Sequence, residues 1–157
     1  MKIVMLTIGK TRSDIMAEGI GMYIDRINHY MPVEIRELPD VKTTKALTEA
    51  RQKELEGQMI IDFLMPGDAM ILLDERGREL TSREFSTFIS KRMASGLKRL
   101  VMVIGGPYGF SPAVYERADG KVSLSRMTFP HEMARLILSE QIYRAMTILR
   151  GEPYHHD

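Results

Sequence analysis

Cysteine and tryptophan are both absent from this 157-residue sequence. The lack of cysteine excludes disulfides, thiolate nucleophiles and cysteine-based metal sites, and it fits the reducing cytoplasm, where we expect the protein to work. No apolar run approaches the roughly 20 residues that span a bilayer, so we expect no membrane partner. The opening stretch Met1–Ile8 is basic and then apolar, but it is too short for the apolar core of a signal peptide.

An excess of charge of one sign is also missing. The 22 Lys and Arg residues nearly balance the 21 Asp and Glu residues, and the net charge of +1 does not itself indicate a nucleic-acid-binding protein. Residues 75–99 are locally basic. Their charge alone favours a solvated helix face. A phosphate-binding patch needs only a few such side chains, so this second interpretation stays open.

The common phosphate-binding and catalytic motifs are absent. Gly105-Gly106-Pro-Tyr-Gly109 fails the G-x-G-x-x-G pattern because its first two glycines are adjacent, and no Lys-Ser or Lys-Thr follows to make a P-loop. There is no G-x-S-x-G nucleophile elbow. No H-E-x-x-H pair occurs, and the adjacent His155 and His156 are typical of a solvated tail, so we expect no metal site.

What is present is a regular alternation of strand and helix patterns. Buried or half-buried strands are predicted at Lys2–Ile8, Val33–Leu38, Asp68–Asp74, Lys98–Ile104 and in a short run from Val122. Helices are predicted over residues 15–27, 44–64, 81–95 and 130–150, with a short one from Ser111. This order predicts one α/β domain, residues 1–157, with a mostly parallel sheet and helices on both faces. The order of the strands in the sheet does not follow from the pattern.

Local signals mark several element ends. Thr81-Ser-Arg-Glu84 has the spacing of a capping box, and Ser111-Pro112 combines a cap residue with a proline at the first helical position. Arg76-Gly77 is interpreted as the turn that closes the third strand. Thr128 is expected to cap the last helix, behind Pro130.

Two strand-to-loop segments in the last third of the chain carry the main functional signal. The first, Val101–Phe110, is an apolar run that stops in a loop of three glycines and a proline, and the second, Val122–His131, turns directly into the last helix. Parallel α/β sheets place their ligand sites at such strand ends, where glycine allows close approach of the backbone. Tight turns alone would also explain the glycines, but the two segments together predict a small-molecule site.

Five blocks of the sequence resemble the RlmH family of SPOUT methyltransferases, in order and over nearly the whole chain. They are Ile71–Asp74, Val103–Phe110, Leu124–His131, Glu140–Ala145 and Pro153–His155. The resemblance implies a parallel α/β sheet with a C-terminal deep trefoil knot, a feature that pattern reasoning would not propose because knots are very rare. It also implies a homodimer that uses S-adenosylmethionine to methylate N3 of a pseudouridine in 23S rRNA, within the assembled ribosome.

The resemblance further implies two groups of site residues. The cofactor would contact Leu73, Gly105, Leu124, Ser125, Arg126, Met127, Thr128 and Phe129. The leucine side chains can equally be core residues, with the neighbouring backbone making the contacts.

The tail residues Tyr154 and His155, with Arg144 on the last helix, would act on the RNA substrate near the dimer interface. The base that removes the N3 proton stays unassigned between His155, Glu140 and water. Arg144 and Glu140, spaced i,i+4, can also be a plain surface ion pair.

Two other classes of function stay open. One is a non-enzymatic RNA-binding module that shares the fold, and the other is an enzyme that uses a different nucleotide. The intact Leu124–Phe129 block argues against the first, because it is the expected cofactor segment. The failed G-x-G-x-x-G match argues against a dehydrogenase of the second class.

Overall fold

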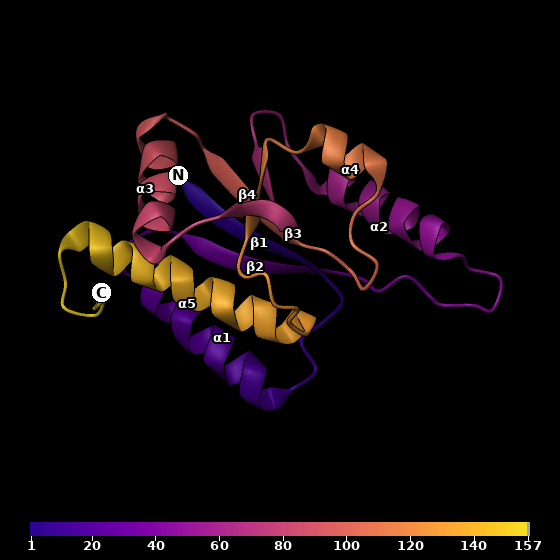
Figure 1. The fold of residues 1–157 in the computed structure, drawn as a ribbon, viewed down its shortest axis with the longest axis horizontal. Coiled ribbons are helices and arrows are strands. Elements are labelled where there is room, and N and C mark those ends of the chain that lie inside the picture. The colour runs from indigo at the N-terminus through magenta and orange to yellow at the C-terminus, as the bar shows by residue number, and fades with distance from the viewer. Residues whose placement is uncertain (157) are drawn as a thin grey trace.

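The structure, a computed structural model, describes residues 1–156 and confirms the predicted alternation of strands and helices. The strands are β1 (Lys2–Ile8), β2 (Val33–Leu38), β3 (Ala69–Glu79), β4 (Arg99–Ile104) and β5 (Gly120–Ser123). The helices are α1 (Asp14–Ile27), α2 (Glu49–Phe63), α3 (Ser82–Ala94), α4 (Pro112–Arg117) and α5 (His131–Arg150). Figure 1 shows how they are arranged.

The strands form one sheet in the order β2-β1-β4-β3-β5, and every neighbouring pair is parallel. The predicted parallel sheet is therefore confirmed, and its order, which the sequence pattern left open, places β1 and β4 at the centre. Because all strands run the same way, their carboxyl ends lie along one edge of the sheet. The loops that leave this edge are the ones in which a ligand site is expected.

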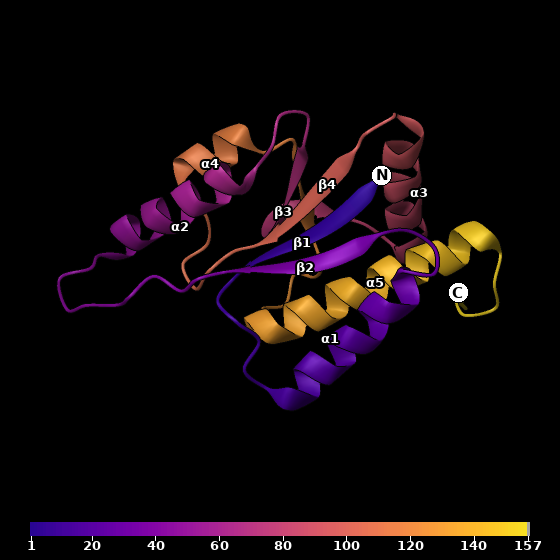
Figure 2. The same cartoon turned by 180° about the vertical axis from the view of Figure 1, so that it is seen from behind.

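Helices cover both faces of the sheet, also as predicted. In Figures 1 and 2, α1, α3 and α5 lie on one face, while α2 and α4 lie on the other. Successive side chains of the central strands point to opposite faces of the sheet, so each strand contributes to two hydrophobic cores. In β1, Ile3 and Met5 pack toward α1, α3 and α5, whereas Val4 and Leu6 pack toward α2 and α4. All four side chains are completely buried.

Most predicted helix starts are confirmed. Thr81 and Glu84 form the reciprocal capping box of α3, and Ser111 caps α4 with Pro112 in the first turn. The expectation for Thr128 is wrong. Pro130 occupies the cap position of α5 and no side chain bonds there, because Thr128 lies two residues upstream in the preceding loop.

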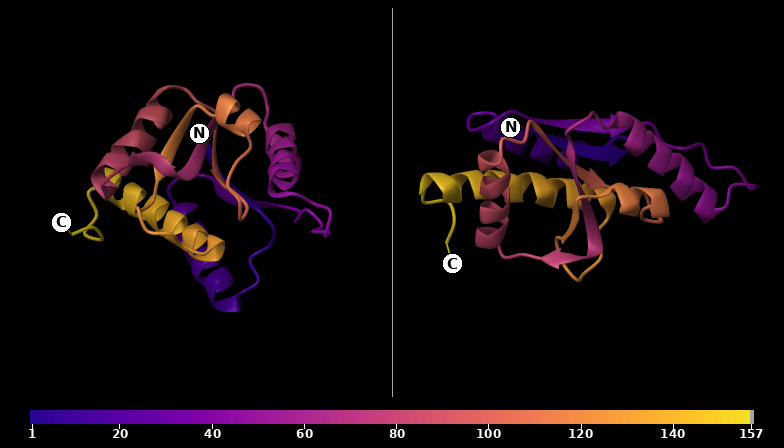
Figure 3. Two further views of the ribbon diagram at one scale, coloured as in Figure 1. Left: turned by 45° about the vertical axis from the view of Figure 1, so that its right-hand side comes forward. Right: turned by 90° about the horizontal axis from the view of Figure 1, so that it is seen from above.

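The predicted turn at Arg76-Gly77 is also wrong. β3 continues to Glu79, and the extra residues form an irregularity in which both Leu73 and Arg78 stand opposite Val122 of β5. A Cβ on Gly77 would lie 2.6 Å from the carbonyl carbon of Val122 and 2.7 Å from its nitrogen, so only glycine allows the two backbones to lie this close. The bulged segment of β3 extends past the carboxyl end of the neighbouring strand β4 (Figure 3).

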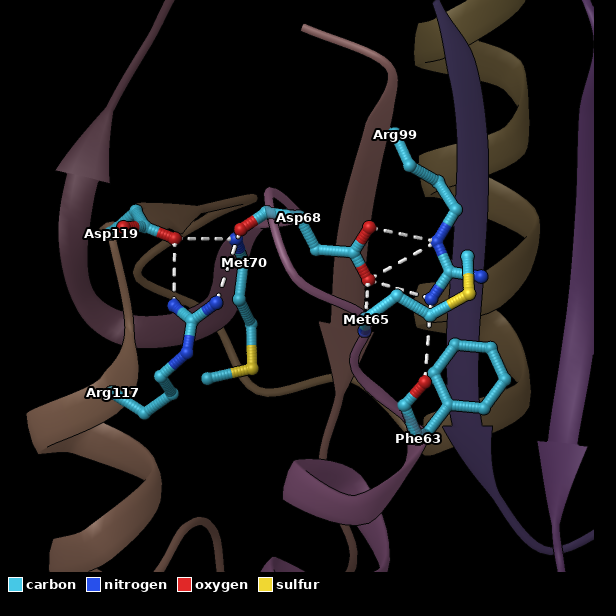
Figure 4. A network of polar contacts seen from close by, with 7 residues as sticks. All are labelled: Phe63, Met65, Asp68, Met70, Arg99, Arg117 and Asp119. Carbon is cyan, nitrogen blue, oxygen red and sulfur yellow. Dashed lines mark hydrogen bonds and ion pairs between the residues drawn. The ribbon is translucent and has the colours of Figure 1, made fainter.

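A network of charged side chains fastens the opposite, amino-terminal edge (Figure 4). The buried carboxylate of Asp68 accepts hydrogen bonds from Arg99 Nε at 3.0 Å and Nη2 at 2.6 Å, and Arg99 also bonds the carbonyl of Phe63. Arg117 bonds the carbonyl oxygen of Asp68 and the carboxylate of Asp119. The network ties the ends of α2 and α4 to the starts of β3 and β4, far from the loops of the other edge.

Within residues 1–156, no helix has both the length and the apolar character needed to cross a membrane.

Candidate cofactor and substrate sites

A cavity of about 560 Å³ opens at the carboxyl edge of the sheet. The later part of β3 and the loops after β4 and β5 build it, with contributions from α2, α4 and the start of α5. Its lining includes Leu73–Arg76, Ile104–Phe110, Ser123–Ser125, Met127–Phe129, Lys53, Pro112, Tyr115, His131 and Ala134. The two strand-to-loop segments that the sequence singled out, Val101–Phe110 and Val122–His131, therefore meet in one cavity.

The β3 side of the cavity is held by a buried carboxylate. Asp74 accepts a short hydrogen bond from the hydroxyl of Tyr115 and another, of 2.8 Å, from the backbone nitrogen of Arg76. Burial, and then the adjacent Asp74 carboxylate, raises the pKa of Tyr115, so its hydroxyl stays protonated and acts as a donor. The Tyr115 ring in turn packs edge-on against Phe110, with ring centroids 5.8 Å apart. This chain of contacts links β3 to the loop that follows β4, Gly105–Gly109, which we call the glycine loop.

The glycine loop closes on itself directly after β4. The nitrogen of Gly109 donates to the carbonyl of Gly106 at 3.2 Å, and Gly109 takes a positive φ of 80°. Gly105 lies against the ring of Phe110, where an added Cβ would come within 3.0 Å of two ring carbons. The loop is thus fixed with its backbone toward the cavity.

The third loop presents most of the residues predicted for the cofactor. Leu124, Ser125, Met127, Thr128 and Phe129 all line the cavity, as do Leu73 and Gly105. Side-chain bonds fix this loop: Ser123 Oγ donates to the carbonyl of Ser125, and the nitrogen of Met127 donates to Ser125 Oγ.

Arg126 is the member of the predicted set that does not line the cavity. Its side chain is 85% exposed and its Nε lies 3.7 Å from the carboxylate of Glu79.

Sequence reasoning missed the contributions of α2 and α4. Lys53 and Tyr115 line the cavity, and Glu56 is buried behind the glycine loop. One feature of the sequence could have indicated the role of α2. Two polar residues lie on its apolar stripe, because Gln52, Glu56 and Ile60 are spaced i, i+4 and i+8. Buried polar groups in that position need a reason.

The predicted substrate residues gather elsewhere, at the end of α5. Arg144 donates to Glu140 Oε1 through Nε at 3.0 Å and Nη2 at 2.5 Å, and the hydroxyl of Tyr154 donates to the same oxygen at 3.0 Å. Arg144 Nη1 lies 3.2 Å from His155 Nδ1. The Tyr154 ring packs edge-on against Tyr143, with centroids 4.8 Å apart. The predicted Glu140–Arg144 pair exists, and it is half-buried rather than on the open surface.

Protonation states follow from these contacts. Burial, followed by hydrogen bonds with Tyr23 and Glu140, raises the pKa of Tyr154, so the phenol keeps its proton. The hydrogen bond with Glu140 raises the pKa of Arg144, which stays cationic. Because a guanidinium can only donate, a hydrogen bond from Arg144 to His155 uses the lone pair of Nδ1.

The two groups of residues are not brought together within one chain. His131 lines the cavity at the start of α5, whereas Arg144 lies about 20 Å further along that helix at 1.5 Å per residue. In Figure 2, the C-terminal tail leaves the far end of α5 and folds back against the last turns of that helix. Within residues 1–156 no three His, Asp or Glu side chains are grouped as a metal site.

The fold and the cavity define a parallel α/β protein with a cavity at the carboxyl edge of its sheet, lined in part by a glycine-rich loop. A family model described as predicted SPOUT methyltransferase matches residues 1–155, and the chain belongs to this family.

Its similar relatives include proteins named ribosomal RNA large subunit methyltransferase H. Those of Parabacteroides distasonis and Porphyromonas gingivalis are 56% and 54% identical, and that of Bacteroides fragilis is 48% identical. Each alignment covers the whole of both chains.

Proposed function

We propose that the protein methylates N3 of a pseudouridine in 23S rRNA with S-adenosylmethionine as methyl donor. The observation that carries the proposal is the cavity in which β3 and the two predicted loop segments meet, in a chain whose relatives are named ribosomal RNA large subunit methyltransferase H. The separate cluster of Arg144, Tyr154 and His155 supplies hydrogen-bond donors and an aromatic ring suited to an RNA base.

The residues of the cavity fit this cofactor. A volume of about 560 Å³ lies within the usual range of ligand pockets, about 300–1,000 Å³. Leu73, Leu124 and Met127 offer apolar walls for an adenine ring, and the glycine loop offers backbone groups to the ribose and methionine portions. Charged side chains of both signs, Asp74 and Glu75 beside Arg76 and Lys53, offer partners to the charged groups of the amino-acid portion.

When bound, the cofactor supplies an electrophilic methyl group. The work left to the chain is to orient the base, exclude water and favour loss of the N3 proton. Glu140 accepts bonds from Arg144, Tyr154 and Gln141, and the lone pair of His155 Nδ1 faces Arg144, so neither is poised as the base. We propose that water takes the proton while Arg144 stabilises the developing anion.

A second subunit completes the site in this proposal. Since the cavity and the tail cluster of one chain are far apart, the tail of the partner would lie over the cavity. Exposed apolar side chains on α1 and α5 support such a contact: Ile15 is 80% exposed, Met22 42% and Leu149 41%. We also propose that the loops around β5 form the deep trefoil knot that the family resemblance implies.

The proposal is tested by two measurements on the full-length protein. Calorimetric titration with S-adenosylmethionine should give one site per chain, and single-turnover assays should transfer a labelled methyl group to 70S ribosomes that lack the modification. RNA binding without cofactor binding would instead support a non-enzymatic module. Sedimentation should show a dimer, and an active monomer would exclude the two-subunit site.

A further inference from the structure

A carboxyl group of α2 is buried without a countercharge. Glu56 is 3% exposed, and its Oε1 accepts one hydrogen bond, from Gln52 Nε2 at 3.0 Å. Its Oε2 is buried and has no hydrogen-bond partner within residues 1–156. Burying an unpaired carboxyl group costs stability unless something else makes use of it.

The group lies directly behind the glycine loop. A Cβ added to Gly106 would come within 2.6 Å of Glu56 Oε1 and closer still to Oε2, so the carboxyl group touches the backbone of this glycine. Gly106 also lines the cavity. A single backbone residue is therefore shared by the buried carboxyl group and the proposed cofactor site.

The charged groups around Glu56 do not neutralise it. Desolvation raises its pKa most strongly, opposed by the hydrogen bond from Gln52 on its own helix and by His131 at the start of α5. Asp40, in the loop after β2, raises the pKa further. Lys53, one turn away on α2, lines the cavity, and no lysine or arginine in residues 1–156 forms an ion pair with Glu56.

We propose that Glu56 is a specificity-determining residue that makes the cavity prefer the cationic sulfonium cofactor over the neutral thioether left after methyl transfer. The inference rests on the proposed function. A positive ligand on the far side of Gly106 supplies the missing countercharge. Because Glu56 is buried, little water screens this attraction across the one layer of backbone. The thioether product lacks the charge and loses the attraction, which promotes its release.

The two ligands and an isosteric variant isolate this effect. S-adenosylmethionine and S-adenosylhomocysteine share the adenosine and the amino-acid portion, and they differ in the methyl group and the sulfonium charge. Glu56→Gln keeps the shape under Gly106 and removes the charge. Calorimetric titration of both ligands should show S-adenosylmethionine binding weakened about tenfold in the variant, with S-adenosylhomocysteine affected less than about twofold.

The matched control is Glu54→Gln on the same helix, an exposed carboxylate paired with Arg51, which should change neither affinity. Binding of S-adenosylhomocysteine shows that the Glu56 variant is folded. Equal weakening of both ligands, or no change in either, would overturn the inference and leave the proposed function standing. Failure of the wild-type protein to bind either ligand would instead refute the proposed function.

A pH series gives a second readout. Glu56 attracts the sulfonium only when ionised, so the preference for S-adenosylmethionine should rise with pH through the elevated pKa of Glu56 and fall as the pH drops below it. In Glu56→Gln this rise should vanish. An identical slope in wild type and Glu56→Gln would contradict the role of Glu56.

Discussion

The hydroxyl of Tyr154 donates a hydrogen bond of 3.0 Å to Oε1 of Glu140, the same oxygen that accepts from Arg144. One carboxylate therefore fastens both the C-terminal tail and the guanidinium of α5. Chain ends usually fray, so a tail held by a half-buried acceptor and an aromatic contact has a defined position. That order is what a substrate-orienting group needs.

Deleting residues 153–157 should separate cofactor binding from substrate engagement. Because the residues that line the cavity all lie between Lys53 and Ala134, S-adenosylmethionine affinity should stay within a few fold. Methylation of 70S ribosomes in single turnover should fall by about two orders of magnitude, equivalent to about 3 kcal/mol of transition-state stabilisation. Tyr154→Phe removes the hydrogen bonds with Glu140 and Tyr23 but keeps the aromatic ring, and it should lose less. A truncated protein with the full methylation rate would show that the tail takes no part.

Substitutions that add a side chain to the glycine loop should abolish cofactor binding. Gly106→Ala places a methyl group against the Glu56 carboxyl group, and Gly105→Val crowds the ring of Phe110, so both should displace the loop from the cavity. Calorimetric titration should detect no S-adenosylmethionine binding by either variant, while the far-ultraviolet circular dichroism stays that of the folded protein. Gly21→Ala is the control, because it meets no atom within 4 Å and should bind normally. Normal affinity in Gly105→Val would remove that loop from the site.

The charged network of Figure 4 should affect stability but not binding. Asp68→Ala leaves the Arg99 guanidinium, whose side chain is only 16% exposed, without its carboxylate. Breaking a buried pair in this way costs about 3–5 kcal/mol. Urea unfolding should show that loss, with an unchanged cofactor affinity at temperatures where the variant is folded. A loss below about 1 kcal/mol would mean that the pair is effectively solvated.

Alkaline pH should weaken the fold partly through Tyr30. Its hydroxyl donates to Glu152 at 2.6 Å, and this bond, followed by burial, raises the pKa of Tyr30 from 10.0 to about 12. A raised phenol pKa stabilises the folded state below pH 10, and the contribution is lost as the pH rises from 10 to 12. In Tyr30→Phe, urea unfolding should depend less on pH across this window. Ultraviolet titration should also lose one phenol with a pKa of about 12, and an unchanged curve would show that Tyr30 titrates normally.

The layered α/β fold followed from local patterns, because runs such as Lys2–Ile8 and caps such as Thr81–Glu84 carry their own signals. The strand order and the continuation of β3 past Gly77 depend on pairing with β5, which is close in space but distant in sequence. The same limit applies to the site. Loop residues such as Gly105 were predictable, whereas Lys53 and Tyr115 reach the cavity only through the packing of α2 and α4 on the sheet.

The cavity has a consequence for synthesis of the protein. Apart from Lys53, every residue that lines it follows residue 72, and its last wall, His131 and Ala134, belongs to the helix that is made last. Domains are translated from the N-terminus, so a nascent chain has most of its sheet before it has any closed cavity. A chain terminated before α5 would lack a wall of the pocket and also the core side chains, such as Leu138 and Ile142, that cover one face of the sheet. Cofactor affinity therefore distinguishes finished chains from interrupted ones.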